Sequence, residues 1–269
     1  MKRIKDWEEL TIQDNFLFLK VMQNKRLCQH LIEKILQIKI VEITYPDTEK
    51  SIDVRWDSKS VRLDVYVKDE TGRVYDIEMQ CENEANNGLA KRTRYYQGMI
   101  DMELLNKGDV YDNLKPSYII FICTFDAFAK SRPMYTFRNR CVEEEGLELN
   151  DEATKIFLNS KGDSKTLDPD VRAFLRYVDG KAAEGKFMKA VEDEVMRVKE
   201  HKETRREYMT YAMEIKRREL AKFKEGREEE RSSIILNMLK DGVAKEIIAK
   251  YVRVSVEYVT ELGKKNHLL

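Results

Sequence analysis

Two short stretches of this chain, residues 62–68 and 74–80, alternate apolar and polar side chains and are separated by a brief segment that contains Gly72. Successive side chains of a β-strand point to opposite faces, so this alternation predicts two strands. Glycine tolerates the positive φ that a hairpin loop with a bulge requires. We therefore predict an antiparallel hairpin, and this part of the chain has to fold as a sheet.

One face of the predicted hairpin collects polar side chains. Asp76, Glu78 and Gln80 share a face of the second strand, and Asp64 lies directly opposite Glu78 if the loop centres on Thr71. Like charges on cross-strand neighbours destabilise a sheet unless positive charge lies between them. Mg²⁺ prefers carboxylate oxygens and also binds phosphates, so it would supply that charge. The same carboxylates are equally consistent with the solvated face of an ordinary hairpin, and the role of Asp76 stays open.

The spacing of Asp64 from Glu78-x-Gln80 resembles the PD-(D/E)xK nuclease signature, with glutamine where that signature usually has lysine. Further segments make the likeness more specific, and together the chain resembles the recombination-promoting nuclease/putative transposase family over roughly residues 10 to 180. These segments are residues 14–22, 92–96, 118–128, 135–137 and 155–162.

This resemblance implies a Mg²⁺-dependent DNA endonuclease that hydrolyses phosphodiester bonds, in which Mn²⁺ could substitute for Mg²⁺. Asp64 and Glu78 would be catalytic residues that hold the metal, and Gln80 would be a third catalytic residue that positions the attacking water. Glutamine offers a hydrogen bond without the positive charge of lysine, so electrostatic stabilisation would depend more on the metal and on arginines. The family further links such an enzyme to recombination, transposition or defence against foreign DNA.

Two arginines are candidates for substrate binding. Arg92 and Arg94 lie near the start of a helix predicted over residues 89–106, where they could contact a phosphate or orient Glu78. Their spacing alone favours a solvated charged turn, whereas the family resemblance favours a functional role for Arg92.

Two further acidic residues lie in a helix predicted over residues 14–36. Asp14 either contributes to the site or simply caps the helix that it begins. Glu33 either supplies an acid from the first helix, as in some members of the wider nuclease superfamily, or faces solvent.

The remaining pattern predicts an α/β fold: a restriction-endonuclease-like mixed sheet flanked by helices, with an all-α C-terminal extension. The nearly continuous apolar run at residues 118–123 is typical of a central strand covered on both faces. Further strands are expected at residues 135–142 and 155–158, and Asp168-Pro169 is typical of a helix start.

Composition limits the class of protein. Apolar residues make up 42% of the chain, enough for a substantial core, and the formal net charge is +0, so any attraction to nucleic acid must come from local patches. No apolar run is long enough to span a membrane, which makes a cytoplasmic protein the expectation. Neither zinc nor disulfide bonds are predicted, because the cysteines have no CxxC spacing and no neighbouring histidine; they are Cys28, Cys81, Cys123 and Cys141.

We predict three regions: a nuclease-like domain at residues 1–185, a charged helical linker at 186–231, and a small helical module at 232–269. The linker carries an intermittent apolar stripe that could pack on the nuclease-like domain or pair with another chain, although a solvated charged helix is the favoured interpretation of the stripe itself. For the chain as a whole, a homo-oligomer formed through the C-terminal helices is expected. The last region is expected to form three short helices in a helix-turn-helix-like outline.

That outline does not by itself predict a sequence-specific DNA reader. The recognition helix would present Glu257 and Glu261 beside Thr260, and acidic side chains are repelled by the phosphates that line a groove. A packing or dimerisation module is the favoured interpretation. The alternative to an enzyme as a whole is a catalytically silent protein that keeps the nuclease fold and acts as a regulator or oligomerising interaction protein.

Overall fold

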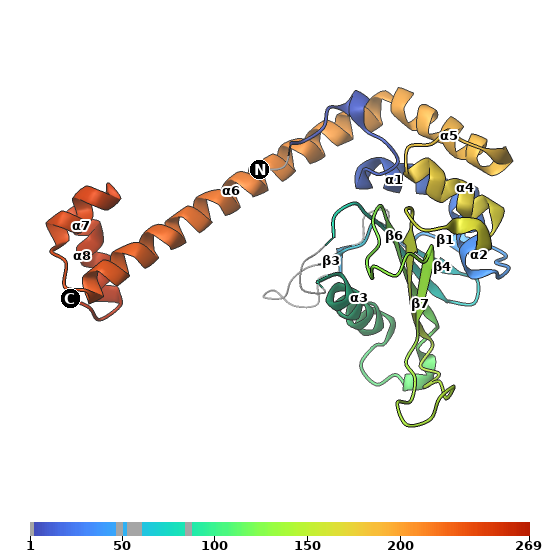
Figure 1. The fold of residues 1–269 in the computed structure, drawn as a ribbon, viewed down its shortest axis with the longest axis horizontal. Coiled ribbons are helices and arrows are strands. Elements are labelled where there is room, and N and C mark those ends of the chain that lie inside the picture. Colours follow the sequence, from blue (N-terminus) through green and yellow to red (C-terminus); the bar gives the residue numbers. More distant parts are fainter. Residues whose placement is uncertain (1–2, 47–50, 53–60, 84–87) are drawn as a thin grey trace. The chain divides into compact units, whose positions relative to one another are not determined.

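The computed structural model describes residues 3–46, 51–52, 61–83 and 88–269 (Figure 1). The chain divides into two compact units, Asp6–Arg205, and Met1–Lys5 with Arg206–Leu269. None of the helices within these ranges combines the length and the hydrophobicity that crossing a lipid bilayer needs.

A six-stranded sheet forms the centre of the larger unit, in the order β1-β4-β5-β6-β8-β7. Strands β5, β6 and β8 are parallel to one another, whereas β1, β4 and β7 each pair antiparallel. The predicted mixed α/β sheet is therefore confirmed. The strands are β1 Ile43–Thr44, β4 Val65–Asp69, β5 Val74–Gln80, β6 Ser117–Cys123, β7 Met134–Phe137 and β8 Ala153–Asn159, and a separate pair consists of β2 Ser51–Ile52 and β3 Val61–Arg62.

Helices cover both faces of the sheet, with α3 on one side and α1, α2 and α4 on the other (Figure 1). Ile119 and Phe121 of β6 belong to the core cluster under α3, whereas the alternate residues Ile120 and Ile122 are also fully buried. This two-sided burial explains the continuous apolar run of β6. The helices are α1 Asn15–Met22, α2 Lys25–Leu36, α3 Gly88–Leu104, α4 Pro169–Val178, α5 Gly185–Glu200, α6 Lys202–Lys240, α7 Lys245–Val252 and α8 Val256–Lys265.

The single helix predicted over residues 14–36 is wrong, because the chain breaks it into α1 and α2 at Gln23 and Asn24. The side chain of Asn24 accepts a hydrogen bond from the backbone N–H of Leu27 and so caps α2. The helical spacing of apolar residues continues across the break, so the break cannot be predicted from that spacing. The helix start predicted at Asp168-Pro169 is confirmed, since Asp168 accepts a hydrogen bond from the N–H of Asp170.

The first strand of the hairpin is also shorter than predicted. β3 ends at Arg62 and β4 begins at Val65, with a bend at Asp64 between them. Leu63 packs in the same core cluster as Tyr66, although strict alternation would place the two on opposite faces. The bend thus interrupts the alternation of the strand at the first candidate acid itself.

The loop between β4 and β5 is held together by one buried carboxylate. Asp69 accepts hydrogen bonds from the N–H and the hydroxyl of Thr71 at 2.9 and 2.7 Å, from the N–H of Arg73 at 3.0 Å and from the hydroxyl of Tyr75 at 2.7 Å. Gly72 has a φ of 87°, as its predicted role in the turn requires. This loop fixes the register of β4 against β5, and so sets the position of Asp64, just before β4, relative to the acids of β5.

Replacing Asp69 with alanine is expected to lower the free energy of unfolding by about 3 kcal/mol, because several buried donors lose a charged acceptor. Burial raises the pKa of Asp69, but the hydrogen bonds from Thr71, Tyr75 and Arg73 outweigh it and hold the pKa below its usual value of 3.8. The stabilisation is therefore complete above about pH 4 and disappears as the pH falls through the lowered pKa. Urea denaturation at several pH values measures the difference.

The wild type and the Asp69→Ala variant should converge in stability at acidic pH. Glu145→Ala, in an exposed loop, is the control and should match the wild type throughout. A difference between Asp69→Ala and wild type that is the same at pH 3 and pH 7 would contradict the role given to the ionised carboxylate.

The smaller unit has its own apolar core, made by the end of α6 with α7 and α8. The first of the three short helices predicted at the C-terminus is not separate but is the last part of α6, which continues to Lys240. Ser255 caps α8 by accepting a hydrogen bond from the N–H of Tyr258, as expected. The buried core residues are Ile235, Leu239, Ile248, Ala249 and Val259.

Candidate active site

The hairpin register brings the first two candidate acids together. Val65 pairs with Ile77 in the antiparallel ladder, so the next position outward sets Asp64 opposite Glu78, as predicted. The N–H of Asp64 donates to Glu78 Oε1 at 2.9 Å, and the N–H of Met79 donates to Asp64 Oδ2 at 3.2 Å. The two carboxylates are thus tied to each other's strands.

The polar face of β5 is covered by α3 and is not a solvated hairpin face. Asp76 and Glu78 are 0% and 3% exposed, and the core cluster beneath α3 contains Val74 on the same face. The carboxylate oxygens of Asp76 have no N–H or hydroxyl donor in the described part of the chain, although the carboxyl lies within hydrogen-bonding reach of that of Glu78. A buried carboxylate with only another acid beside it is costly, so Asp76 joins the candidate acids on structural grounds.

The carboxyls of Asp76 and Glu78 resist ionisation. Burial raises the pKa of both well above the usual range, and the negative charge of Asp64 raises each pKa further. The Arg92 guanidinium lowers both but does not reverse the direction. An additional cation among these groups would favour their ionised forms.

Arg92 extends from α3 to Glu78 and Gln80 of β5. Its Nη2 donates to Glu78 Oε2 at 3.2 Å and to Gln80 Oε1 at 2.9 Å. Its guanidinium carbon lies 4.7 Å from the centre of the Phe121 ring and 5.4 Å from that of Tyr96. Packing against two rings fixes the orientation of the positive charge.

Gln80 is held by the protein at both ends of its amide. Besides accepting from Arg92, it donates through Nε2 to the carbonyl oxygen of Glu82. The contact to Arg92 places a positive charge beside the position where the nuclease signature usually has lysine. The predicted water-positioning role of Gln80 stays a prediction.

The remaining candidates lie apart from this group or turn away from it. Arg94 is exposed on α3, whereas Arg92, two residues earlier, points inward. Asp14 stands at the start of α1, but its carboxylate accepts from the N–H of Thr11 at 2.8 Å. Glu33 accepts from the N–H of Ile40 at 2.9 Å and so fastens the chain that follows α2.

Asn15 was not anticipated from the sequence. Its Nδ2 donates to Asp64 Oδ1 at 3.3 Å, which connects α1 to the site. The only available signal was its place beside Asp14 at the start of a helix, and that place is equally typical of a helix cap. The contact depends on α1 packing against β5, which a local pattern does not contain.

The residues of the site fit a divalent cation that prefers oxygen. Among the described residues, no three histidine, cysteine or acidic side chains converge in an arrangement ready to hold a metal ion. The carboxylates of Asp64 and Glu78 instead accept hydrogen bonds from the protein, while the buried oxygens of Asp76 have no N–H or hydroxyl donor in those ranges. A site of carboxylates without histidine or cysteine suits Mg²⁺ or Mn²⁺ rather than zinc.

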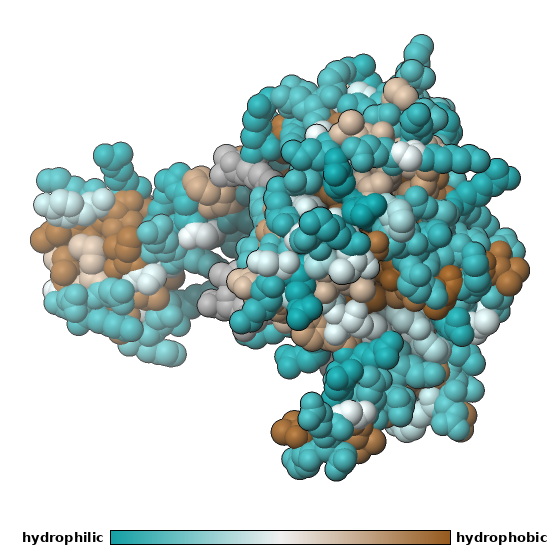
Figure 2. Space-filling model, turned by 45° about the vertical axis from the view of Figure 1, so that its right-hand side comes forward, coloured by the Kyte–Doolittle hydropathy of each residue, from teal (hydrophilic) through white to brown (hydrophobic). Residues whose placement is uncertain are grey.

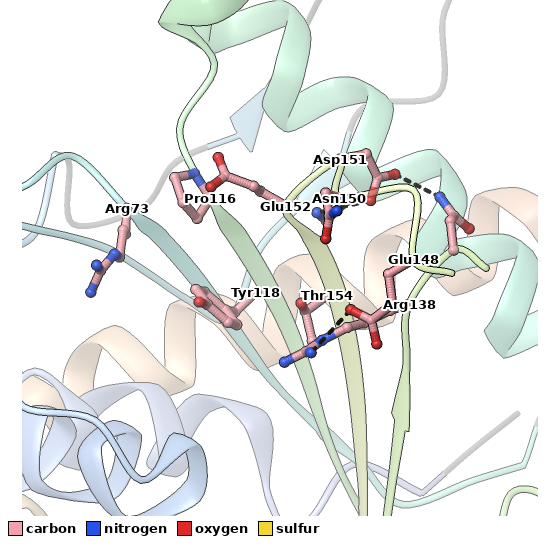
Figure 3. Close-up of a pocket in the computed structure, with 11 residues that line it drawn as sticks. Arg73, Pro116, Tyr118, Arg138, Glu148, Asn150, Asp151, Glu152 and Thr154 are labelled. Carbon is pink, nitrogen blue, oxygen red and sulfur yellow. Dashed lines mark hydrogen bonds and ion pairs between the residues drawn. The ribbon is translucent and has the colours of Figure 1, made fainter. Parts of the chain in front are cut away.

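A separate pocket of about 440 Å³ lies at the N-terminal ends of the parallel strands β6 and β8 (Figure 3). Arg138 pairs there with Glu148 at 3.4 Å, and Asn139 donates to Asp151 at 2.6 Å. The site acids lie toward the other ends of the parallel strands, so this pocket is distinct from the candidate active site.

Comparison with protein families matches residues 15–232 to a family described as PD-(D/E)XK nuclease family transposase. The match covers more than half of the chain and continues past the stretch of roughly residues 10 to 180 in which the resemblance was seen. Neither the curated proteins nor the solved structures include a match.

Proposed function

The chain belongs to the PD-(D/E)XK nuclease family of transposases, and from this premise we propose that it is a metal-dependent endonuclease that hydrolyses phosphodiester bonds of DNA. One observation carries the proposal beyond family membership. Asp64 faces Glu78 across the hairpin, and the buried Asp76 lies close enough for the charge of Asp64 to act on it, with no N–H or hydroxyl donor to Asp76 in the described part of the chain. A resident cation would balance this charge.

Asp64 and Glu78 would hold the metal, with Asp76 beside them as a further source of negative charge. Mg²⁺ is the proposed ion, and Mn²⁺ is expected to substitute. When bound, the ion would neutralise charge on the scissile phosphate and make water a stronger nucleophile.

Arg92 would supply the positive charge that lysine usually gives at the position of Gln80. Its contacts to Glu78 and Gln80 orient it, and the rings of Tyr96 and Phe121 pack against its partly buried guanidinium. A fixed charge in such surroundings stabilises negative charge on a phosphate more strongly than a hydrated one. Gln80 would then orient Arg92 and the attacking water together.

Arg94 has a different proposed role, because its exposed side chain is free to follow a bound strand. We assign it to the DNA backbone rather than to the reacting phosphate. The reaction would serve recombination, transposition or defence against foreign DNA, the processes with which this family is associated.

The C-terminal helices are proposed to join two copies of the chain. Figure 2 shows hydrophobic surface gathered on the helices at the C-terminal end. The exposed apolar residues of the smaller unit include Ile234, Ile247, Tyr251 and Leu269. Contiguous exposed apolar surface is typical of protein interfaces, and sedimentation of the purified protein would measure the oligomeric state.

Cleavage of supercoiled plasmid by the purified protein tests the proposed activity. Nicked or linear product is expected with Mg²⁺ or Mn²⁺, and none with EDTA, because the reaction needs an ion that the acids hold. Ca²⁺ serves as a comparison, since it takes oxygen ligands but with longer and more flexible coordination. Asp64→Ala, purified in the same way, reveals any contaminating nuclease.

Absence of cleavage by folded protein on both plasmid and single-stranded DNA, with either Mg²⁺ or Mn²⁺, would reject the nuclease. It would favour instead a regulator that retains the fold.

A further inference from the structure

The segment that follows β6 begins at the C-terminal ends of the parallel strands, beside Gln80 of the candidate site. Residues 124–133, here called the basic loop, connect β6 to β7. The N–H of Thr124 donates to the carbonyl oxygen of Gln80 at 3.0 Å, and its hydroxyl donates to that of Cys81 at 3.3 Å. The far end is fastened to the end of β8, where Asn159 donates to the carbonyl oxygen of Arg132 at 3.0 Å.

Two side chains organise the interior of the basic loop. Asp126 accepts from the N–H of Phe128 at 3.1 Å, from the N–H of Ser131 at 2.6 Å and from the hydroxyl of Tyr135 at 2.7 Å. That hydroxyl in turn accepts from the N–H groups of Lys130 and Arg132 at 3.2 and 3.1 Å. The backbone of the loop is therefore held by the protein and does not depend on solvent.

The basic loop also contains strained backbone. Ala129 and Ser131 have φ values of 53° and 55°, a left-handed conformation that costs roughly 1–2 kcal/mol for a residue with a side chain. Such a conformation persists only where the surroundings fix it, and it concentrates at functional sites. The two left-handed residues lie on either side of Lys130 and just before Arg132, so the strained backbone sets the direction of these two cationic side chains.

The basic loop presents positive charge outward and apolar side chains inward. Lys130 and Arg132 are exposed, and neither forms an ion pair with any described residue. Lys161 and Lys165 beyond β8, by contrast, pair with Asp179 and Asp163.

The apolar side of the basic loop is occupied by the protein itself. The ring of Phe128 packs edge-on against Phe157 with centroids 5.0 Å apart, so it is not available to stack on a base. What remains exposed is suited to phosphate rather than to base edges.

We propose that the basic loop is a DNA-backbone contact, in which Lys130 and Arg132 hold phosphates next to the one that is cleaved. The proposal rests on the proposed function, since it places the substrate of that same site. It also explains how a chain with a formal net charge of +0 would attract DNA, because two unpaired cations on a rigid loop form a local patch. Asp126, the acid of the loop, is turned inward by its three donors.

Fluorescence anisotropy of a labelled DNA duplex tests this contact, with EDTA present so that no cleavage competes with binding. The variant is Lys130→Ala with Arg132→Ala, and the control is Lys107→Ala with Lys115→Ala, which removes the same charge from exposed positions in the segment that leads from α3 to β6. The loop variant should weaken binding by on the order of ten-fold and reduce the slope of log K against log salt by about two, near 0.9 for each lost phosphate contact. The control should keep the wild-type slope.

Tyr135→Phe provides a second measurement that leaves the charge unchanged. It removes the hydroxyl that fixes the loop, so a preorganised contact predicts weaker binding, whereas a diffuse effect of charge predicts none. Melting temperatures of all variants establish that they are folded.

Three results would each overturn the contact. They are an unchanged salt slope in the loop variant, a reduction of the slope in the control equal to that in the loop variant, and no DNA binding by the wild type. A salt slope that is reduced in the loop variant but not in the control would support the DNA contact even if the wild type cleaves no DNA. In that case only the proposed nuclease activity is rejected. Cleavage by the wild type together with an unchanged slope would reject the contact and leave the nuclease standing.

Discussion

Replacing Glu78 with glutamine is expected to reduce DNA cleavage by at least about a thousand-fold, which corresponds to roughly 4 kcal/mol of lost transition-state stabilisation. Glutamine keeps the size of the side chain but gives up the negative charge that would hold the metal. Asp64→Asn should have an effect of similar size, because the two carboxylates face each other across the hairpin. Initial rates of plasmid cleavage in Mg²⁺ measure both.

The stability of the Glu78→Gln variant separates a lost function from a damaged fold. Glu78 is buried beside two other acids and its pKa is raised, so removing its charge should leave the melting temperature in EDTA unchanged or higher. The matched control is Glu194→Gln, another buried glutamate, which pairs with Arg197 on α5. That variant should lose stability and retain cleavage.

Cleavage by Glu78→Gln at more than a tenth of the wild-type rate would exclude Glu78 as a metal ligand. Equal loss of cleavage in Glu194→Gln would point to a general dependence on stability instead.

Replacing Arg92 with alanine is expected to lower the cleavage rate by about a hundred-fold, the usual effect of removing one preorganised group that stabilises charge. Arg92→Lys should retain part of the activity, since an ammonium keeps the charge but does not reproduce the two contacts to Glu78 and Gln80. The decisive variant combines Arg92→Ala with Gln80→Lys. Lysine then occupies its usual position in the nuclease signature, and the double variant should recover to within about ten-fold of wild type.

Lys91→Ala is the control for this series, because Lys91 is an exposed cation next to Arg92 on the same helix. A double variant no more active than Arg92→Ala would mean that Arg92 does not replace the missing lysine. Melting curves in EDTA belong to the same experiment, since removal of Arg92 leaves Glu78 without its guanidinium partner.

The hairpin was the part of the fold that local pattern predicts best. Its register follows from alternation and from one glycine, and those features lie within a few residues of one another. The helix break at Asn24 and the bend at Asp64 were missed because apolar spacing continues across both, while a side-chain cap and a change of pairing partner decide the backbone.

The candidate site was predictable only where it depends on the hairpin. The pairing of Asp64 with Glu78 is a local consequence of register, and the proximity of Arg92 came from family resemblance. The burial of Asp76 follows from α3 covering the polar face of β5, and the contact of Asn15 follows from α1. Both are tertiary facts, and a polar residue on an alternating strand is otherwise expected to face water.

The order of these elements along the chain has a consequence for how the protein assembles. Asp64, Asp76, Glu78, Gln80 and Arg92 come from one hairpin and the helix that follows it, so the acids first meet through contacts between near neighbours in sequence. Hairpins form within microseconds, and contacts of low sequence separation form before distant ones. The acids would therefore be brought together early in folding, before β6 pairs with β5, and their mutual repulsion would oppose a step on which the rest of the sheet depends. A divalent ion present during folding would then accelerate the formation of the sheet in addition to serving the finished enzyme.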